Sequence, residues 1–185
     1  PAWALGEFFH NEYTCVFCIS STLLTASLLM TGCSAGDESG TTQTQISINS
    51  SGEPAAALAV TNWVKGEPVD ISTGVHVIEF WATWCPPCRT SIPHLTELQE
   101  KFKDRDVNVI GISNEELATV ESFVKKMGDK MAYTVAIDAG ATSKGYMGKY
   151  GIGGIPHAFV VKDGEVVWHG HPKGKLDDAI EGALK

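Results

Sequence analysis

The order of apolar and polar residues along the chain divides it into three parts. From Val16 to Met30, ten of fifteen residues are apolar and none is charged. Residues 34–53 consist mostly of Ser, Thr, Gly, Gln and Asn, so they have almost nothing to bury and are predicted to form a flexible spacer. From residue 54 onward, strand-like and helix-like patterns alternate, which predicts one α/β domain over residues 54–185.

The alternation in this last part predicts a central sheet flanked by helices. Runs rich in β-branched and aromatic residues predict strands, at residues 75–81, 107–112, 133–137, 158–161 and 166–169, the last two forming a hairpin. Apolar residues three or four apart predict helices, at residues 86–103, from a cap at Ser113 or Asn114 to a stop at Gly128, at 142–150 and at 175–184. Residues 58–64 and 68–71 are predicted to pair as an N-terminal β-hairpin extension.

Composition and charge narrow the possible functions. The 185 residues are 43% apolar and 19% charged, which suits one folded domain with an appendage. The formal net charge of −8 argues against a nucleic-acid partner. No Lys or Arg precedes Lys65, and from that residue onward 14 basic residues stand against 17 acidic ones, so the acidity of the domain itself is slight. Five cysteines are too few for a small domain built on disulfides.

The apolar N-terminal segment suits the hydrophobic region of a signal peptide. It ends in Leu-Leu-Met-Thr-Gly-Cys at residues 28–33, which resembles the lipobox of bacterial lipoproteins. The resemblance implies that residues 1–32 are a signal peptide, that Cys33 is lipidated, and that residues 33–53 tether the domain to a membrane. A plain signal peptide or a residual membrane anchor is the alternative. Each of these predicts export to the bacterial cell envelope or periplasm.

A Cys-Pro-Pro-Cys sequence, preceded by Trp84, follows a predicted buried strand and opens a predicted helix. Two cysteines three positions apart at a helix start can close a small disulfide ring. Cys85 also lies near the free N–H groups of the first helical turn and the positive end of the helix dipole, which lower the pKa of its thiol. Because Pro86 and Pro87 lack N–H groups, the first N–H to reach the Cys85 sulfur is that of Cys88. We therefore expect a less oxidising disulfide than in variants that keep those amides.

Other interpretations of this cysteine pair fit less well. A haem-attachment site needs a His after the second cysteine, where Arg89 stands. A structural zinc site needs a second C-x-x-C in the domain, whereas the other such pair, Cys15 and Cys18, lies in the segment predicted to be removed. A structural disulfide remains an alternative, although it would not require Trp84 or a helix start.

Residues 80–89, Phe-Trp-Ala-Thr-Trp-Cys-Pro-Pro-Cys-Arg, resemble the active-site signature of the thioredoxin superfamily. The Pro-Pro dipeptide and the exported context look like its TlpA/ResA-like branch of membrane-tethered thiol-disulfide oxidoreductases. Pro93 falls where thioredoxins have a kink-forming helix proline, and Glu79 occupies the place of their buried acid. Residues 150–156, Tyr-Gly-Ile-Gly-Gly-Ile-Pro, resemble the segment leading to their cis-proline. The resemblance implies a thioredoxin-like fold over residues 54–185.

The resemblance also implies roles for single residues. Cys85 would be the exposed nucleophile, and the more buried Cys88 would resolve the mixed disulfide. Glu79 would lie buried beneath the pair, with a raised pKa suited to relaying the Cys88 proton. Pro156 is predicted to be cis, with its loop against Cys85. That loop, at Ile155, and the Trp84 side chain would bind substrate.

The predicted function is therefore a thiol-disulfide oxidoreductase of the cell envelope that reduces disulfides in protein substrates. It would take electrons from a membrane oxidoreductase and need no bound cofactor or metal. One alternative is a peroxiredoxin-like thiol peroxidase, although Thr83 and Cys85 lack the Thr-x-x-Cys spacing of that site. Another is a copper or haem-maturation chaperone that uses both cysteines and His157. The same histidine could instead tune Cys85, hold a substrate or pack in the strand, and His169 and His171 favour a solvated turn over a metal site.

Overall fold

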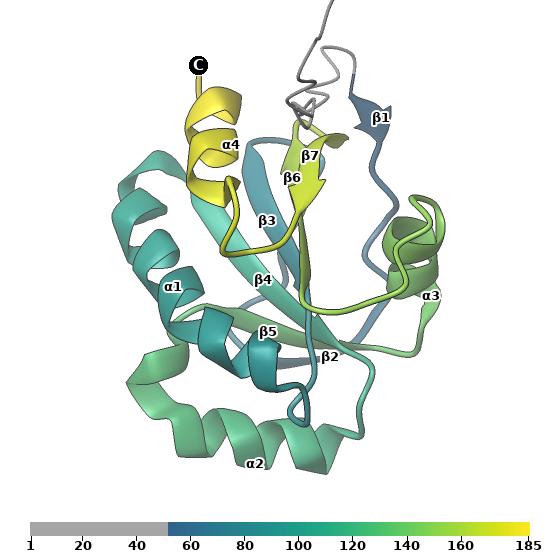
Figure 1. Ribbon diagram of the computed structural model, residues 1–185, viewed down its shortest axis with the longest axis vertical. Helices are drawn as coiled ribbons and strands as arrows, with labels where there is room; N and C mark the ends of the chain where they lie inside the picture. Colours follow the sequence, from purple (N-terminus) through teal and green to yellow (C-terminus); the bar gives the residue numbers. More distant parts are fainter. Residues whose placement is uncertain (1–51) are drawn as a thin grey trace, which may run out of the picture. The chain divides into compact units, whose positions relative to one another are not determined.

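The computed structural model describes residues 52–185, which form one mixed sheet with helices on both faces (Figure 1). The sheet has seven strands in the order β1-β7-β6-β3-β4-β5-β2. The strands are β1 (Glu53–Pro54), β2 (Val60–Lys65), β3 (Val75–Phe80), β4 (Val107–Ser113), β5 (Thr134–Asp138), β6 (His157–Lys162) and β7 (Glu165–Gly170). The helices are α1 (Pro86–Phe102), α2 (Leu117–Met127), α3 (Ala141–Ser143) and α4 (Leu176–Ala183), with 3-10 turns η1 (Lys103–Arg105) and η2 (Gly128–Met131) and a π-helical segment η3 (Lys144–Gly148).

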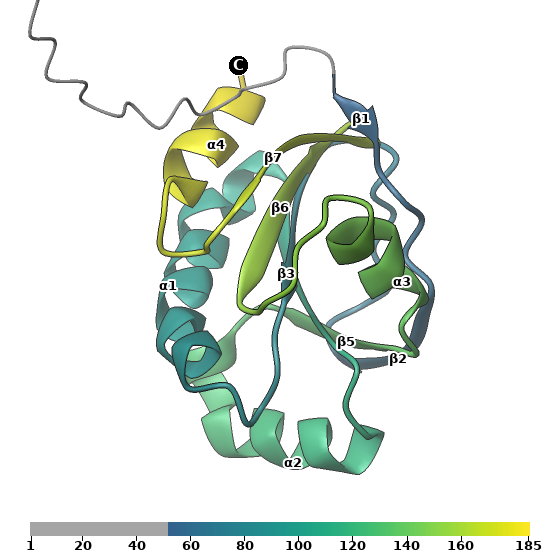
Figure 2. The same ribbon diagram turned by 45° about the vertical axis from the view of Figure 1, so that its right-hand side comes forward.

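Strand β3 forms the centre of the sheet. It pairs in parallel with β4 and antiparallel with β6, and β4 in turn pairs in parallel with β5. All six residues of β3 are buried, as expected where helices cover both faces. Helices α1 and α4 lie on one side of the sheet and α3 on the other (Figure 2). Strands β3 and β4 run in the same direction, so they end at the same edge of the sheet, beside the start of α1.

Side chains of the central strands alternate between two apolar clusters, because successive strand residues point to opposite faces. Val77 and Trp81 pack with residues of α1, α2 and α4. Ile78 and Phe80 pack with Tyr146 of η3 and other residues on the opposite face. The sheet therefore separates two hydrophobic cores. Cys85 and Cys88 belong to the core that contains Val77 and Trp81.

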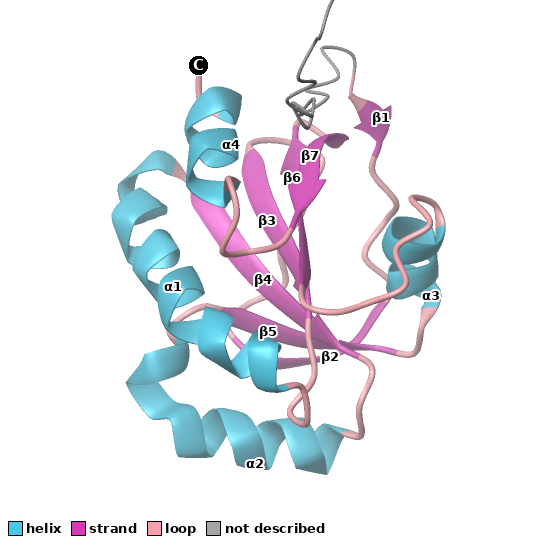
Figure 3. Cartoon of the chain, in the orientation of Figure 1, coloured by secondary structure: helices cyan, strands magenta, loops and turns pink. Residues whose placement is uncertain are grey.

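The predicted N-terminal hairpin is wrong. Strand β2 pairs antiparallel with β5 at one edge of the sheet, β1 pairs with β7 at the other, and residues 68–71 form no strand (Figure 3). Lys65 holds β2 in place, since its Nζ donates to the carbonyls of Gly128 and Met131 at 3.4 and 2.6 Å. The turn at Gly66, with φ of +78°, then leads the chain away from β2. Two edge strands therefore replace the expected hairpin.

The start of α2 also differs from the prediction. Neither Ser113 nor Asn114 caps this helix, because Ser113 is the last residue of β4 and α2 begins after Glu116. The Ser113 hydroxyl instead bonds to Glu115. The predicted end is confirmed, since Gly128 follows the helix with φ of +55° and its N–H donates to the carbonyl of Val124.

Several predictions about the N-terminal part fall outside residues 52–185. The predicted signal peptide, Cys33, the Cys15 and Cys18 pair and nearly all of the spacer belong to that part. Within the described residues, no helix is both long and apolar enough to cross a bilayer.

Candidate active site

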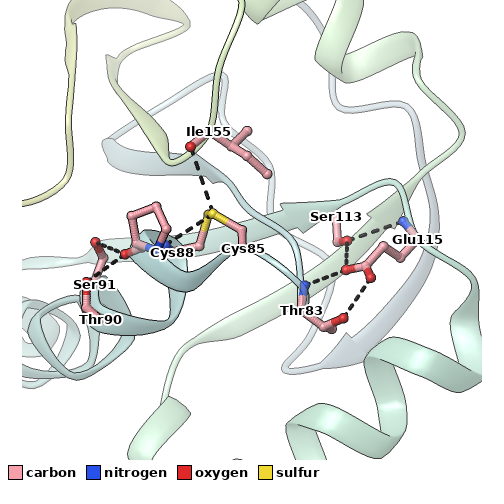
Figure 4. The surroundings of a disulfide bond; sticks show 9 residues. Thr83, Cys85, Cys88, Thr90, Ser91, Ser113, Glu115 and Ile155 are labelled. Carbon is pink, nitrogen blue, oxygen red and sulfur yellow. Dashed lines mark hydrogen bonds between the residues drawn. A yellow bond between two sulfur atoms is a disulfide. The ribbon is translucent and has the colours of Figure 1, made fainter.

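Cys85 and Cys88 form a disulfide at the first turn of α1, with their Cα atoms 5.3 Å apart (Figure 4). Cys85 is the N-cap of the helix, and its Sγ accepts a hydrogen bond from the backbone N–H of Cys88 at 3.2 Å. Pro86 and Pro87 occupy the two positions between them and supply no N–H. This confirms that the Cys88 amide is the first donor to reach the Cys85 sulfur. The sulfur thus receives one backbone N–H where a helix without these prolines would offer more.

The loop before β6 covers the disulfide from the other side. The Ile155–Pro156 peptide bond is cis, as predicted, and Pro156 is buried. The Ile155 carbonyl oxygen lies 3.9 Å from Cys85 Sγ (Figure 4). In the reduced protein this carbonyl is placed to accept a weak hydrogen bond from the Cys85 thiol. The backbone of this loop therefore touches the reacting sulfur.

The exposure predicted for Cys85 is wrong for this disulfide form. Cys85 is 2% exposed and Cys88 is fully buried. The reason lies far along the chain, since the Ile155 loop covers a sulfur that the helix start alone would leave open. Cys85 nevertheless lines a cavity of about 550 Å³, together with Trp84 and Ile155. Access to its sulfur is thus through this cavity.

The cavity has mostly apolar walls. Pro87, Met147 and Ile152 contribute to them, whereas Asn114 and Ser143 add polar groups. Trp84 stands at the cavity with 69% of its surface exposed, so it does not pack in the core. An exposed indole beside an apolar cavity is suited to contact with another molecule.

Glu79 lies in β3 on the sheet face that α1 covers, and it is 1% exposed. Strand alternation puts it on the same face as Val77 and Trp81, which share a cluster with Cys88. The burial predicted for Glu79 is confirmed, and it raises the pKa of this carboxyl to about 8. A carboxyl with such a pKa can both hold and release a proton near neutral pH.

A carboxylate that the sequence analysis did not single out holds the turn before Cys85. Glu115 accepts hydrogen bonds from the backbone N–H of Thr83 at 2.6 Å and from the Thr83 hydroxyl at 2.7 Å (Figure 4). The Ser113 hydroxyl donates to the same carboxylate at 3.2 Å. The available signal was the polar sequence Ser-Asn-Glu at the end of a buried strand. Glu115 thus ties the end of β4 to the turn that carries Trp84.

His157 lies beside the loop but points to other partners. Its Nε2 is 3.1 Å from Nδ1 of His169, and its ring packs on Phe159. Burial, with smaller effects of His169 and His171, lowers the pKa of His157 to about 4. Phe159 belongs to the core on the sheet face opposite the cysteines. Within residues 52–185, no group of three or more His, Cys, Asp or Glu side chains is arranged to hold a metal ion.

Comparison with known proteins agrees with this geometry. A family model described as "AhpC/TSA family" matches residues 52–169. The thiol-disulfide oxidoreductase ResA of Bacillus thuringiensis (strain Al Hakam) is 35% identical over 122 residues, which are 63% of this chain and 66% of the relative. ResA of Bacillus subtilis (strain 168) is 24% identical over 132 residues, 71% of this chain and again 66% of the relative. The chain thus spans just under two thirds of these relatives.

Solved structures share the fold. A crystal structure of a thiol:disulfide interchange protein of the thioredoxin family, from Chlorobium tepidum TLS, superposes with a TM-score of 0.62 at 28% identity. The match covers 74% of this chain and 99% of that protein. The predicted thioredoxin-like fold, with its central mixed sheet flanked by helices, is confirmed. The chain belongs to the AhpC/TSA family, has a thioredoxin-like fold and is similar to the ResA thiol-disulfide oxidoreductases.

Proposed function

We propose that this protein is a thiol-disulfide oxidoreductase that reduces disulfides in protein substrates through Cys85 and Cys88. The observation that carries the proposal is the placement of the disulfide. It lies at a helix N-terminus, against the backbone of Ile155 and at the wall of an open cavity. The ResA relatives and the interchange protein of Chlorobium tepidum support the same activity. The dithiol is itself the redox group, so the reaction needs no cofactor.

The reaction transfers two electrons from the dithiol to the substrate. The Cys85 thiolate attacks one sulfur of the substrate disulfide, forms a mixed disulfide and releases the other sulfur as a thiolate. The Cys88 thiolate then attacks Cys85 Sγ, which closes the internal disulfide and releases the second substrate thiolate. The helix N-terminus and the Cys88 N–H stabilise the Cys85 thiolate that starts the sequence.

Glu79 serves the second step in this proposal. Cys88 is fully buried, so its thiol needs an internal base before it can attack. The Glu79 carboxylate takes that proton and becomes the neutral acid that its buried environment favours. A base whose pKa lies near the working pH is effective for such a transfer.

Substrate binding is proposed at the cavity beside Cys85. Trp84 would pack on the substrate, and the backbone at Ile155 would pair with an extended segment beside its disulfide. Pro156 would keep this loop against Cys85, where the loop covers the disulfide. These positions support binding of a polypeptide over binding of a small polar molecule.

Trapping tests the proposal. The Cys88→Ala variant should accumulate substrate proteins as mixed disulfides on Cys85, because the resolving thiol is gone. The matched control is the double variant that also carries Cys85→Ser, which should trap nothing. Insulin reduction by the wild-type protein should be lost in Cys85→Ser alone. Absence of mixed disulfides together with full insulin reduction in Cys85→Ser would overturn the proposal, and rapid peroxide consumption by the purified protein would favour a thiol peroxidase.

We further propose that the protein works in the bacterial cell envelope as a lipoprotein anchored through Cys33. The apolar segment and the lipobox-like sequence before Cys33 support this location. A membrane oxidoreductase would then return two electrons to the Cys85–Cys88 disulfide after each cycle. Labelling with a radioactive fatty acid should mark the wild-type protein and not the Cys33→Ser variant. Equal labelling of both would refute lipidation at this residue.

A further inference from the structure

Most of the unpartnered polar atoms in the core gather in one place. Within residues 52–185, six buried side-chain nitrogen or oxygen atoms lack a hydrogen-bond partner, namely Nδ1 of His76, both carboxyl oxygens of Glu79, Nε1 of Trp81 and the hydroxyls of Tyr133 and Tyr150. Buried polar atoms without a partner are rare in folded proteins and each calls for a physical reason. Four of these six belong to Glu79, Trp81 and Tyr133, all on the sheet face that carries the cysteines.

Gly111 of β4 shows how close these side chains lie. It is the direct strand partner of Glu79. A Cβ atom placed on Gly111 would come within 3.0 Å of Cε2 of Tyr133 and 3.1 Å of Nε1 of Trp81. A side chain at position 111 would therefore displace the Tyr133 ring and the Trp81 indole, and glycine leaves room for both beside the strand partner of Glu79. Burial, and to a smaller extent the negative charge of an ionised Glu79, raises the pKa of the Tyr133 hydroxyl.

The chemistry of the three groups is complementary. The Tyr133 hydroxyl and the Trp81 indole N–H are donors, whereas an ionised carboxylate only accepts. Ala158, the partner of Glu79 on β6, offers no polar side chain. Besides Glu79, the buried titratable side chains on this face of the sheet are Tyr133 and, in the reduced protein, Cys85 and Cys88. The two donors are therefore the side chains that can stabilise a charge on Glu79.

We propose that Tyr133 and Trp81 are positioning residues for Glu79, whose strand partner is Gly111. Their donor groups stabilise the ionised form of the Glu79 carboxyl. This inference rests on the proposed function, in which Glu79 takes the proton of Cys88. In the reduced protein the carboxylate must exist before it can accept that proton. The hydroxyl and the indole N–H lower the cost of this charge and so set how much of the base is present near neutral pH.

The test is the pKa of Glu79 in the oxidised protein, measured by NMR with a ¹³C label in its carboxyl group. Tyr133→Phe removes only the hydroxyl and should raise this pKa by about one pH unit. The matched control is Tyr150→Phe, which also removes a buried, unpartnered hydroxyl and should leave the pKa unchanged. Glu79→Gln identifies the signal, since it alone should abolish the titration.

A merely structural role for Tyr133 gives a different result. Loss of an unpartnered hydroxyl would then keep or raise the melting temperature and leave the Glu79 titration where it is. That outcome, or an equal rise in Tyr150→Phe, would overturn the inference. If Tyr133→Phe does not fold, 3-fluorotyrosine at position 133 keeps the ring and strengthens the donor. It should lower the Glu79 pKa, and an unchanged pKa would again refute the inference.

The measurement separates this inference from the proposed function. It uses the disulfide form, in which neither cysteine titrates and no substrate is needed. Failure of the trapping experiment would leave the Glu79 pKa and its dependence on Tyr133 intact. Conversely, an unchanged pKa in Tyr133→Phe would leave trapping on Cys85 unaffected.

Discussion

The Glu79→Gln substitution should change how the stability of the oxidised protein depends on pH. Burial raises the pKa of Glu79 from 4.5 to about 8 in the folded protein, whereas the unfolded chain exposes the same carboxyl to water. Between these two values the folded protein keeps a proton that the unfolded chain releases. Rising pH therefore favours unfolding, and the full stability is present only below the unfolded pKa.

The size of the effect follows from the width of this window. Each pH unit inside it corresponds to about 1.4 kcal/mol of unfolding free energy. Between about pH 5 and about pH 7.5, the wild-type protein should lose about 3 kcal/mol relative to Glu79→Gln. The glutamine does not titrate, and every other titratable group is common to both proteins. The disulfide keeps Cys85 and Cys88 out of the titration.

Urea unfolding at several pH values provides the measurement. The unfolding free energy of the wild-type protein is subtracted from that of Glu79→Gln at each pH, and the difference should rise with pH. The matched control is Glu121→Gln, which changes an exposed carboxyl of α2 and should keep the slope of the wild-type curve. A flat difference for Glu79→Gln, or one that falls with pH, would mean that the pKa of Glu79 is not raised in the folded protein.

Three further substitutions test the site. Pro87→Ala restores a backbone N–H near the Cys85 sulfur, so it should lower the pKa of that thiol and raise the reduction potential by about 30 mV in a glutathione titration. Trp84→Ala should raise the KM for a protein substrate severalfold while the melting temperature stays the same, because the indole is 69% exposed. Glu115→Ala frees the Thr83 turn and should lower kcat/KM about tenfold, and Glu115→Gln should restore part of it. An unchanged reduction potential in Pro87→Ala, an unchanged KM in Trp84→Ala or an unchanged kcat/KM in Glu115→Ala would contradict the respective expectation.

Much of the active site could be predicted from short stretches of sequence. The Cys85–Cys88 ring needs only a helix start and a spacing of three residues. The burial of Glu79 was predicted from a family resemblance, because strand alternation alone does not say which face of the strand is buried. The cis bond at Pro156 was predicted from a resemblance to a known family, since composition and periodicity do not specify it. These features depend on neighbours in sequence or on a short motif.

The features that the sequence did not reveal depend on contacts between distant parts of the chain. Strand β2 has a strand-like pattern, but nothing in that pattern says that it pairs with β5 and not with the residues just after it. Cys85 is covered by Ile155, seventy positions later. The roles of Glu115 and Tyr133 could not be predicted, because they depend on the position of β4 between β3 and β5 in the sheet. Pairing partners and sheet order, not element types, were the missing information.

The sheet order also explains how a core can hold an unpartnered acid. Each such buried polar atom costs about 1–3 kcal/mol, and Glu79 lies in β3, whose six residues are all buried. The strand is covered on both faces by apolar clusters, whose burial provides the stability that this site lacks. The same enclosure raises the Glu79 pKa and brings the carboxyl under α1, where the cysteines react. The burial of Glu79 thus both destabilises the protein and gives this carboxyl the pKa that its proton transfer needs. A variant that removes the destabilisation should therefore also lose the proton transfer.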